Sequence, residues 1–398
     1  MRSLLVVLLL LAPAARAEEL GVSGKDVAGK VSLNGDAVSL AVTTFSKAAP
    51  VARTISGRVV SRTPQLLRFT WTKTTSTVGL SERLAFWRPP VPTVTNQTVT
   101  VDMRREGPDG ASVWVGTVDG QEQRWVEQPA QGDLVVLVVP GLSTNLWNQY
   151  GVPYLDENLG ALRARGFDAR RLTINTEESI AVNAREIAAE IRKETTRGKR
   201  VLLLAHSKGG ADTVTALSDP ANRDLLPKVV AFMAIQPVYG GSPIADLVGG
   251  HCAIQGMVDL FFERVLPVVN RVDDTGDRGA VQDLRTERRQ ALLREHPFPV
   301  DRVATVVCRG HFSGRPFAKP RHVLRKPLWA FQKFLEKSKG IQSDGMVALE
   351  GQRIPGAKAE FTLNDIDHFE PGFRGESPYS PCDVTNRLLD ATLPFIAR

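Results

Sequence analysis

Apolar and polar residues follow two different patterns along this chain, and the change falls near residue 130. Beyond it, Leu134–Val139 is an unbroken apolar run, and Arg200 is followed by another at residues 201–205. Such runs are typical of strands buried on both faces of a parallel sheet. Stretches with helical spacing separate such runs, and strands that alternate with helices indicate parallel βαβ units. We therefore expect an α/β domain over residues 131–398. Its expected strands are residues 134–139, 169–174, 200–205, 229–235, 303–308 and 359–363, and its expected helices include residues 154–165, 179–197 and a segment that ends at residue 217.

Residues 18–130 have short runs rich in valine and threonine, which are separated by glycine, proline and asparagine. Such runs are typical of β-strands. We expect a β-rich N-terminal domain or extension, built as a small β-sandwich or as an addition to the main sheet, with residues 89–92 (Pro-Pro-Val-Pro) as a rigid break. Two interpretations stay open, a binding or anchoring module and a cover packed against the α/β domain. The expected strands are residues 30–33, 38–44, 55–61, 66–72, 98–103 and 111–118.

The first 17 residues have the character of a leader. A basic start at Arg2 precedes an apolar run over residues 4–11, and small residues at Ala15 and Ala17 follow it. This order is typical of a secretory signal peptide. We predict cleavage after Ala17 and an exported protein, either periplasmic or secreted. The alternative is an uncleaved membrane anchor, but the run is short for a segment that must span a bilayer.

The composition is that of a globular protein, with 42% hydrophobic and 23% charged residues, because a disordered chain would have fewer apolar residues. The formal net charge is +7. The densest basic segments are residues 285–289 and 319–326, which we interpret as solvated faces and linkers. No nucleic-acid-binding motif accompanies them, so we expect no nucleic-acid partner.

Three cysteines, Cys252, Cys308 and Cys382, follow the leader. Export makes a disulfide possible, and three cysteines allow one bridge in three pairings. Their spacing does not fit a zinc site, and none lies beside a plausible base. We expect no metal and no cofactor from these residues.

The strongest chemical signal is the pentapeptide at residues 205–209, Ala-His-Ser-Lys-Gly, between an apolar strand and a helix. A serine on such a sharp strand-to-helix turn is lifted out of the sheet, and the turn requires small residues two positions away on each side. Ala205 stands where glycine is usual and is small enough. The helix N-terminus also points at the reacting carbonyl. We therefore predict Ser207 as a nucleophile, the alternative being a serine that only caps the helix.

A nucleophilic serine needs a base, and the base needs an acid to orient it. In this arrangement the chain order is serine, then aspartate or glutamate, then histidine. His368 lies on a loop after the last expected strand, where the base belongs, and His311 is the second candidate. Asp344 is followed by glycine in a tight turn that can present a carboxylate. The remaining candidates are Asp365 and Asp367 for the acid, and His251, His296 and His322 for the base.

The negative charge that develops on the substrate requires two fixed donors. One is expected to be the backbone N–H of Lys208, directly after the nucleophile, and the other the N–H of Leu142, in the loop after the first strand. Gly141 lets that loop approach closely. The charged side chain of Lys208 stands at a helix N-terminus, which disfavours cations, and contact with a lid or with an acidic substrate would explain it.

Together these residues resemble the secreted bacterial lipases and esterases of the α/β-hydrolase superfamily, over roughly residues 131–398. The resemblance implies an α/β-hydrolase fold, a Ser207–Asp344–His368 triad, hydrolysis of carboxylic esters, and no required metal. It also ranks Asp344 and His368 above the other candidates. In the loop before Gly141, Pro140 stands where the family has histidine. The motifs that carry the resemblance are residues 138–142, 205–209, 239–246, 282–286, 296–297, 343–347 and 366–368.

Residues 244–275 place apolar side chains at helical spacing, which predicts either a mobile lid or a helix packed permanently on the core. We expect an ester or lipid substrate and transient contact with a lipid interface. Three other functions stay open: a non-catalytic binding protein with this fold, an acyltransferase, and a polyester depolymerase that grips its polymer with residues 18–130.

Overall fold

The computed structural model describes residues 18–46, 50–63, 65–77, 93–106, 113–128, 132–144, 147, 151–248, 279–312 and 325–396. The chain divides into two compact units, and each is described by itself. The first unit comprises Met1–Val22, Gly29–Val42 and Ala52–Glu127, and the second comprises Ser23–Ala28, Thr43–Val51 and Gln128–Arg398. The predicted signal peptide, most of the predicted lid, residues 89–92 and Cys252 lie outside the described residues.

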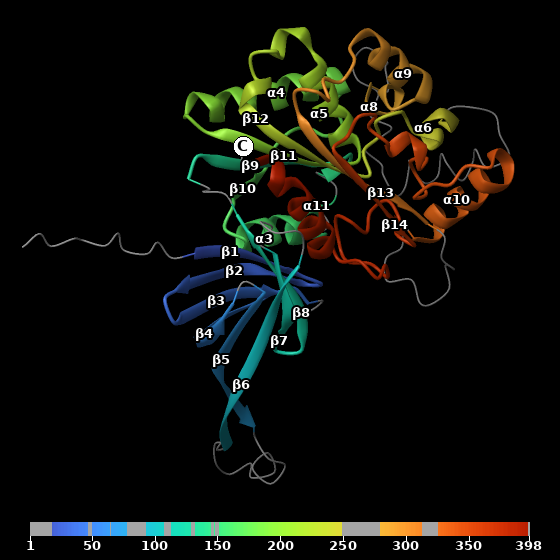
Figure 1. The fold of residues 1–398 in the computed structure, drawn as a ribbon. Coiled ribbons are helices and arrows are strands. Elements are labelled where there is room, and N and C mark those ends of the chain that lie inside the picture. Colours follow the sequence, from blue (N-terminus) through green and yellow to red (C-terminus); the bar gives the residue numbers. More distant parts are fainter. Residues whose placement is uncertain are drawn as a thin grey trace, which may run out of the picture. The chain divides into compact units, whose positions relative to one another are not determined.

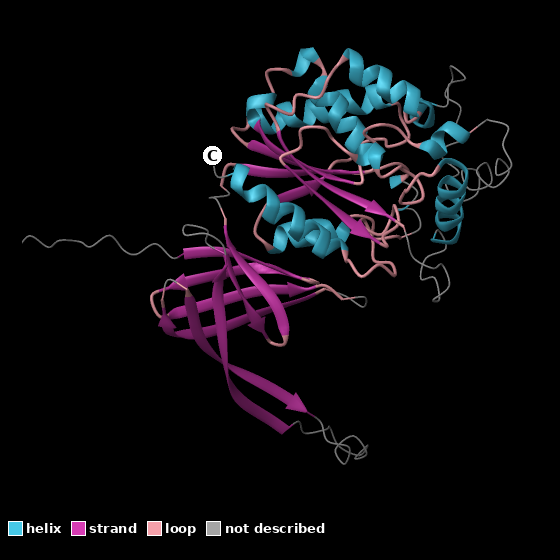
Figure 2. Ribbon diagram, turned by 45° about the vertical axis from the view of Figure 1, so that its right-hand side comes forward, coloured by secondary structure: helices cyan, strands magenta, loops and turns pink. Residues whose placement is uncertain are grey.

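The N-terminal strands form a closed barrel in which the neighbours follow sequence order from β1 to β8 (Figure 2). The longest pairing joins β5 and β6 antiparallel, from Leu66 opposite Arg104 to Thr77 opposite Thr93. Alternate residues such as Leu67 and Phe69 are buried, and the Phe69 ring stacks on Trp125 with 5.4 Å between centroids. The strands are β1 (Glu18–Gly24), β2 (Val27–Asn34), β3 (Ala37–Thr44), β4 (Val51–Arg62), β5 (Leu66–Thr77), β6 (Thr93–Glu106), β7 (Val113–Val118) and β8 (Gln121–Glu127).

The β-rich prediction for this region is confirmed, but the sandwich is wrong. A sandwich and a barrel share the same alternation of buried and exposed side chains, because both bury one face of each strand. What separates them is the pairing of the first strand with the last, β1 with β8, and no local pattern encodes that closure.

The second unit is built on a six-stranded sheet in the order β10-β9-β11-β12-β13-β14, and every pairing is parallel. All six residues of β9, which lies between β10 and β11, are buried. The predicted parallel sheet is confirmed. The strands are β9 (Leu134–Val139), β10 (Asp168–Arg171), β11 (Arg200–His206), β12 (Val229–Ile235), β13 (Ala304–His311) and β14 (Ala359–Asn364).

Helices cover both faces of this sheet, with α4 (Ile180–Thr196) and α5 (Lys208–Ser218) on one face and α3 (Asp156–Ala164) and α11 (Pro381–Ile396) on the other (Figure 1). One core cluster shows why: alternate residues of β9 and β11 pack with the apolar stripes of α4 and α5. The intervening residues of β11, His206 among them, therefore face the layer of α3 and α11. The remaining α-helices with described bounds are α6 (Pro243–Leu247), α8 (Gly279–Asp283), α9 (Thr286–Glu295) and α10 (Arg325–Lys339).

Two arginines in the basic segments correct the prediction of solvated faces. Arg289 is buried and donates to Thr215 Oγ1 at 3.1 Å. Arg325 is also buried, and it donates to Glu370 Oε1 at 2.6 Å. Both guanidinium groups therefore make hydrogen bonds inside the second unit.

Cys308 and Cys382 are buried and free, so neither takes part in the disulfide that export would allow. Within the described ranges, none of the helices is both long enough and apolar enough to cross a bilayer.

Candidate active site

The strand-to-helix turn at Ser207 is strained and held from several sides. Ser207 joins β11 to α5 with φ 57° and ψ −127°, a left-handed conformation that costs a non-glycine residue on the order of 1–3 kcal/mol. Its N–H donates to Ile235 O at 3.1 Å, and its carbonyl accepts from Val238 N–H at 3.2 Å. A Cβ on Gly209 would lie 2.4 Å from Pro140 O, so only glycine allows the start of α5 to approach the preceding loop this closely.

Ser207, His368 and Asp344 form a continuous line of hydrogen bonds. Ser207 Oγ lies 2.7 Å from His368 Nε2, and His368 Nδ1 lies 2.8 Å from Asp344 Oδ2. All three residues are buried, with 7%, 3% and 0% of their surfaces exposed, respectively. A carboxylate can only accept, so His368 carries its proton on Nδ1, and Nε2 is left to accept from the serine hydroxyl. This arrangement can remove the hydroxyl proton during attack on a carbonyl.

Asp344 is fixed by donors on both of its oxygens. The N–H groups of Met346 and Val347 donate to Oδ1 at 2.9 and 2.8 Å, and Gln352 Nε2 donates to Oδ2 at 3.2 Å. Gly345 has φ 98°, which closes the tight turn that the Asp-Gly pair predicts. Gln352 is a site residue that the sequence analysis missed, since no motif marks it.

The rival acids and bases lie elsewhere. Asp367 Oδ1 accepts from the N–H groups of Phe369 and Glu370 at 2.9 and 3.2 Å and so shapes the loop that carries His368. His311 Nε2 lies 2.9 Å from Asn364 Oδ1. His251 and His322 are outside the described residues.

Of the two predicted oxyanion donors, Lys208 directly follows Ser207, and Leu142 follows Gly141, which lies close to Ser207. A Cβ on Gly141 would lie 2.9 Å from Ser207 Cβ, so the loop before Leu142 presses directly on the turn. The carbonyl of Gly141 accepts from Thr144 Oγ1 at 2.8 Å, which orients the peptide that carries the Leu142 N–H. In the described part of the chain, neither the Leu142 N–H nor the Lys208 N–H has a hydrogen-bond acceptor.

The side chain of Lys208 is closed off from solvent and has a partner that the expectation above did not include. It is fully buried, and its Nζ lies 3.0 Å from each carboxylate oxygen of Asp212, one helical turn further on. Asn183 Nδ2 donates to the same carboxylate at 3.1 Å. Burial raises the pKa of Asp212, and the Lys208 charge opposes that shift. The cation that seemed misplaced at a helix N-terminus is therefore neutralised inside the protein.

Tyr154 and His206 are buried polar residues beside the triad that the sequence analysis did not single out. Tyr154 Oη lies 3.0 Å from Gly141 N and 2.5 Å from His206 Nδ1. His206 Nε2 lies 2.9 Å from the carbonyl oxygen of His368. Burial, followed by repulsion from His368, lowers the pKa of His206 to about 3. Burial also raises the pKa of the Tyr154 hydroxyl, so both side chains are neutral near pH 7.

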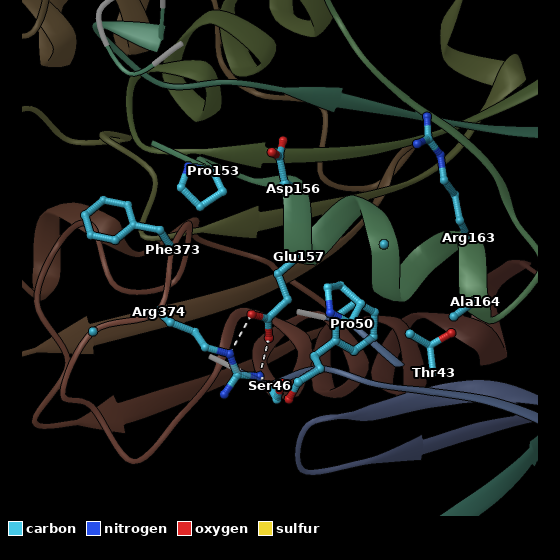
Figure 3. A pocket seen from close by; sticks show the side chains of 13 residues that line it. Thr43, Ser46, Pro50, Pro153, Asp156, Glu157, Arg163, Ala164, Phe373 and Arg374 are labelled. Atoms are coloured by element: carbon cyan, nitrogen blue, oxygen red, sulfur yellow. Dashed lines mark hydrogen bonds and ion pairs between the residues drawn. The ribbon is translucent and has the colours of Figure 1, made fainter. Parts of the chain in front are cut away.

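A cavity of about 950 Å³ opens elsewhere in the second unit (Figure 3). Its walls include Pro153, Phe373, and the ion pair between Glu157 and Arg374, whose closest atoms are 2.7 Å apart. Burial raises the pKa of Glu157, against the effect of Arg374. None of Ser207, His368 and Asp344 lines this cavity, so it is distinct from the space in front of the serine. Among the described residues, no group of three or more histidine, cysteine, aspartate or glutamate side chains is placed to hold a metal ion.

No protein-family model matches the chain, and no curated protein matches it. Among solved structures, the chain is similar to the mature form of Bacillus licheniformis lipase BlEst2, with 19% identity over 68% of this chain and 95% of that chain and a TM-score of 0.45. It is also similar to the metagenomic carboxyl esterase MGS0156, with 21% identity over 74% and 77% of the two chains and a TM-score of 0.48. A third similarity is to phospholipase PlaB from Legionella pneumophila, with 15% identity over 56% and 46% of the two chains and a TM-score of 0.39. All three TM-scores lie below 0.5, so these similarities do not assign the chain to a family.

Proposed function

We propose that this protein is an exported serine hydrolase that cleaves carboxylic esters, with Ser207 as nucleophile, His368 as base and Asp344 as the acid that orients the base. One observation carries the proposal: a serine on a strained strand-to-helix turn lies 2.7 Å from a histidine whose other nitrogen lies 2.8 Å from a buried aspartate. A serine that only capped the helix would accept a hydrogen bond from the first turn of α5, and the Ser207 side chain makes no such bond.

In the proposed reaction, Ser207 Oγ attacks the ester carbonyl carbon while His368 Nε2 takes the hydroxyl proton. Asp344 stabilises the imidazolium that forms, and the N–H groups of Leu142 and Lys208 bind the developing oxyanion. The imidazolium then protonates the departing alcohol, which leaves an acyl group on Ser207. Water, activated by His368, attacks this acyl-enzyme, and the acid product leaves.

The surroundings of His368 favour a substrate with an apolar portion. Phe369 meets the His368 ring edge to face at 5.4 Å between centroids, and Trp147 meets Phe369 in the same way at 5.5 Å. Phe373 stacks on Phe369 at 6.2 Å. These rings make the surroundings of His368 apolar, which supports the proposal of a lipase-like or esterase-like substrate.

A fluorophosphonate probe combined with a series of nitrophenyl esters of increasing acyl length tests the proposal. The wild type should label and hydrolyse at least one ester, whereas Ser207→Ala should do neither, because the covalent intermediate cannot form. Ser338→Ala is the matched control, since Ser338 is exposed and its hydroxyl donates to Phe334 O within its own helix. When the chain is expressed with its leader, the labelled protein should lie outside the cytoplasm and begin at Glu18. Equal inactivity of wild type and Ser207→Ala on every ester would overturn the hydrolase. An uncleaved leader would overturn the predicted cleavage after Ala17, and labelled protein inside the cytoplasm would overturn export.

A further inference from the structure

Two buried side chains outside the triad lie between the loop at Gly141 and the residue that supplies the base. Tyr154 precedes α3, and His206 is the last residue of β11, so they reach each other from elements 52 positions apart in the chain. Each is only 1% exposed. Together they bridge the loop at Gly141 to the backbone of His368.

The donors and acceptors in this chain of bonds allow one direction only. The carbonyl oxygen of His368 can only accept, so His206 Nε2 must carry a proton. His206 is neutral because burial disfavours its charged form, which leaves Nδ1 without a proton. The Tyr154 hydroxyl therefore donates to Nδ1, and its oxygen is free to accept from the Gly141 N–H. The Tyr154 hydroxyl and the His206 imidazole thus each donate one hydrogen bond and accept one.

These hydrogen bonds link the loop that carries a proposed oxyanion donor to the residue that supplies the base. Gly141 directly precedes Leu142, whose N–H is a proposed oxyanion donor. His368 supplies both the base and the carbonyl that accepts from His206. The Tyr154 hydroxyl would lie only 2.8 Å from a Cβ placed on Gly141, and the Tyr154 ring only 2.5 Å from one placed on Gly372. Two glycines thus make room for this tyrosine, one on the oxyanion loop and one four residues after the base.

We propose that Tyr154 and His206 are positioning residues for ester hydrolysis, which hold the oxyanion loop and the base in register with Ser207 through one directed chain of hydrogen bonds. The inference rests on the proposed function of the Ser207 site. Both side chains are buried, so they act through Leu142 and His368. Because catalysis depends on donors aimed at the transition state, loss of these hydrogen bonds should lower kcat more than it raises KM.

Tyr154→Phe removes the hydroxyl and keeps the ring, and it is compared with Tyr379→Phe, whose ring lies against Arg387 at 5.4 Å. Activity is divided by the number of sites that a fluorophosphonate titrates, so that misfolded protein does not count. We expect Tyr154→Phe to lower kcat per site about 10- to 100-fold, because a misplacement of about 1 Å can cost about 100-fold, and to change KM by less than about threefold. Tyr379→Phe should match the wild type.

His206→Gln supplies a second variant that breaks the same link. Its amide nitrogen can still donate to the His368 carbonyl, but it offers Tyr154 no acceptor at the position of Nδ1. If the two residues act as a unit, the double variant should be no more than about threefold slower than the slower single variant, because effects within one network are not additive. A loss of kcat in the double variant equal to the product of the two single losses would overturn the inference that the two residues act as a unit.

Imidazole nitrogen NMR of the wild type provides a readout that does not depend on turnover. His206 should be protonated on Nε2 alone and remain neutral from about pH 5 to pH 8, and Tyr154→Phe should shift its Nδ1 resonance. A proton on Nδ1, or titration within that range, would overturn the chain of bonds. Wild-type kcat per site in Tyr154→Phe would overturn the positioning role alone, whereas a wild type that neither labels nor turns over would overturn the proposed function and the positioning role with it.

Discussion

The buried pair of Lys208 and Asp212 permits a quantitative test of how the turn at Ser207 is stabilised. Their side chains are 0% and 1% exposed, and the ammonium lies 3.0 Å from both carboxylate oxygens. Removing one partner of a buried ion pair leaves an uncompensated charge, which costs about 3–5 kcal/mol. In Lys208→Met, Asp212 keeps its hydrogen bond from Asn183 and the attraction of Arg289, so we expect the lower limit, about 3 kcal/mol.

That loss should be visible in thermal and urea unfolding of the intact chain. A destabilisation of about 3 kcal/mol corresponds to a fall in Tm of roughly 6–12 °C, taking about 2–4 °C per kcal/mol for a unit of this size. Asp212→Asn should cost a similar amount because it leaves the ammonium unpaired, while its amide oxygen can still accept from Asn183. The double variant contains no buried charge at this place, so it should return to within about 2 kcal/mol of the wild type.

The pH dependence of Lys208→Met follows from the carboxyl group. Burial already raises the pKa of Asp212, and removal of the lysine removes a charge that lowers it. A carboxyl whose pKa is higher in the folded protein than in the unfolded chain destabilises the fold once pH exceeds its unfolded pKa. The difference in stability between Lys208→Met and wild type should therefore shrink as pH falls toward about 4. Wild-type Tm in Lys208→Met, or a double variant that loses the sum of the single losses, would refute this account of the pair.

Two further substitutions test the site itself. Gly141→Ala places a Cβ 2.8 Å from Tyr154 Oη and 2.9 Å from Ser207 Cβ, so the loop must move and kcat on nitrophenyl esters should fall about 100-fold. The control is Gly132→Ala, whose Cβ meets nothing within 4 Å. Equal rates for the two variants would contradict the close approach of Gly141 to Ser207. Gln352→Leu removes the donor to Asp344 Oδ2 and both bonds to the Gly310 backbone. We expect kcat to fall about 10-fold and the free energy of unfolding to fall by about 1–3 kcal/mol, both measured beside the exposed control Gln290→Leu. An unchanged kcat would show that the backbone donors alone orient Asp344.

The parts of the second unit that the sequence predicted are those that local patterns determine. Strand β11 is predictable because Val201–Ala205 are apolar on both faces, and the turn at Ser207 because small residues surround a serine between a strand and a helix. The chain order led to Asp344 and His368, and the fold brings both to Ser207. Boundaries shifted where the backbone departs from the pattern: the helix expected from residue 154 begins at Asp156, since Leu155 has φ 63°.

Long-range pairing explains most of what was missed. Strand β8 has only two apolar residues, Trp125 and Val126, in seven positions, and closure of the barrel depends on partners that no local window contains. Tyr154 belongs to no motif, and its role became visible only when the fold placed it against His206. The pairing of Lys208 with Asp212 is different, because residues four apart on a helix are neighbours and the spacing itself could have predicted it.

The residues on either side of Ser207 hold its strained conformation in place. A non-glycine residue in the left-handed region persists only where its surroundings hold it there. His206, immediately before the serine, is bonded to Tyr154 and to the His368 carbonyl, while Lys208, immediately after it, is bonded to Asp212. Both neighbours of the strained residue are thus buried polar side chains with specific partners, one toward the layer of α3 and the other within α5. An apolar residue at either position could fill the volume, but it would leave the partner unsatisfied and one side of the turn without a directional anchor.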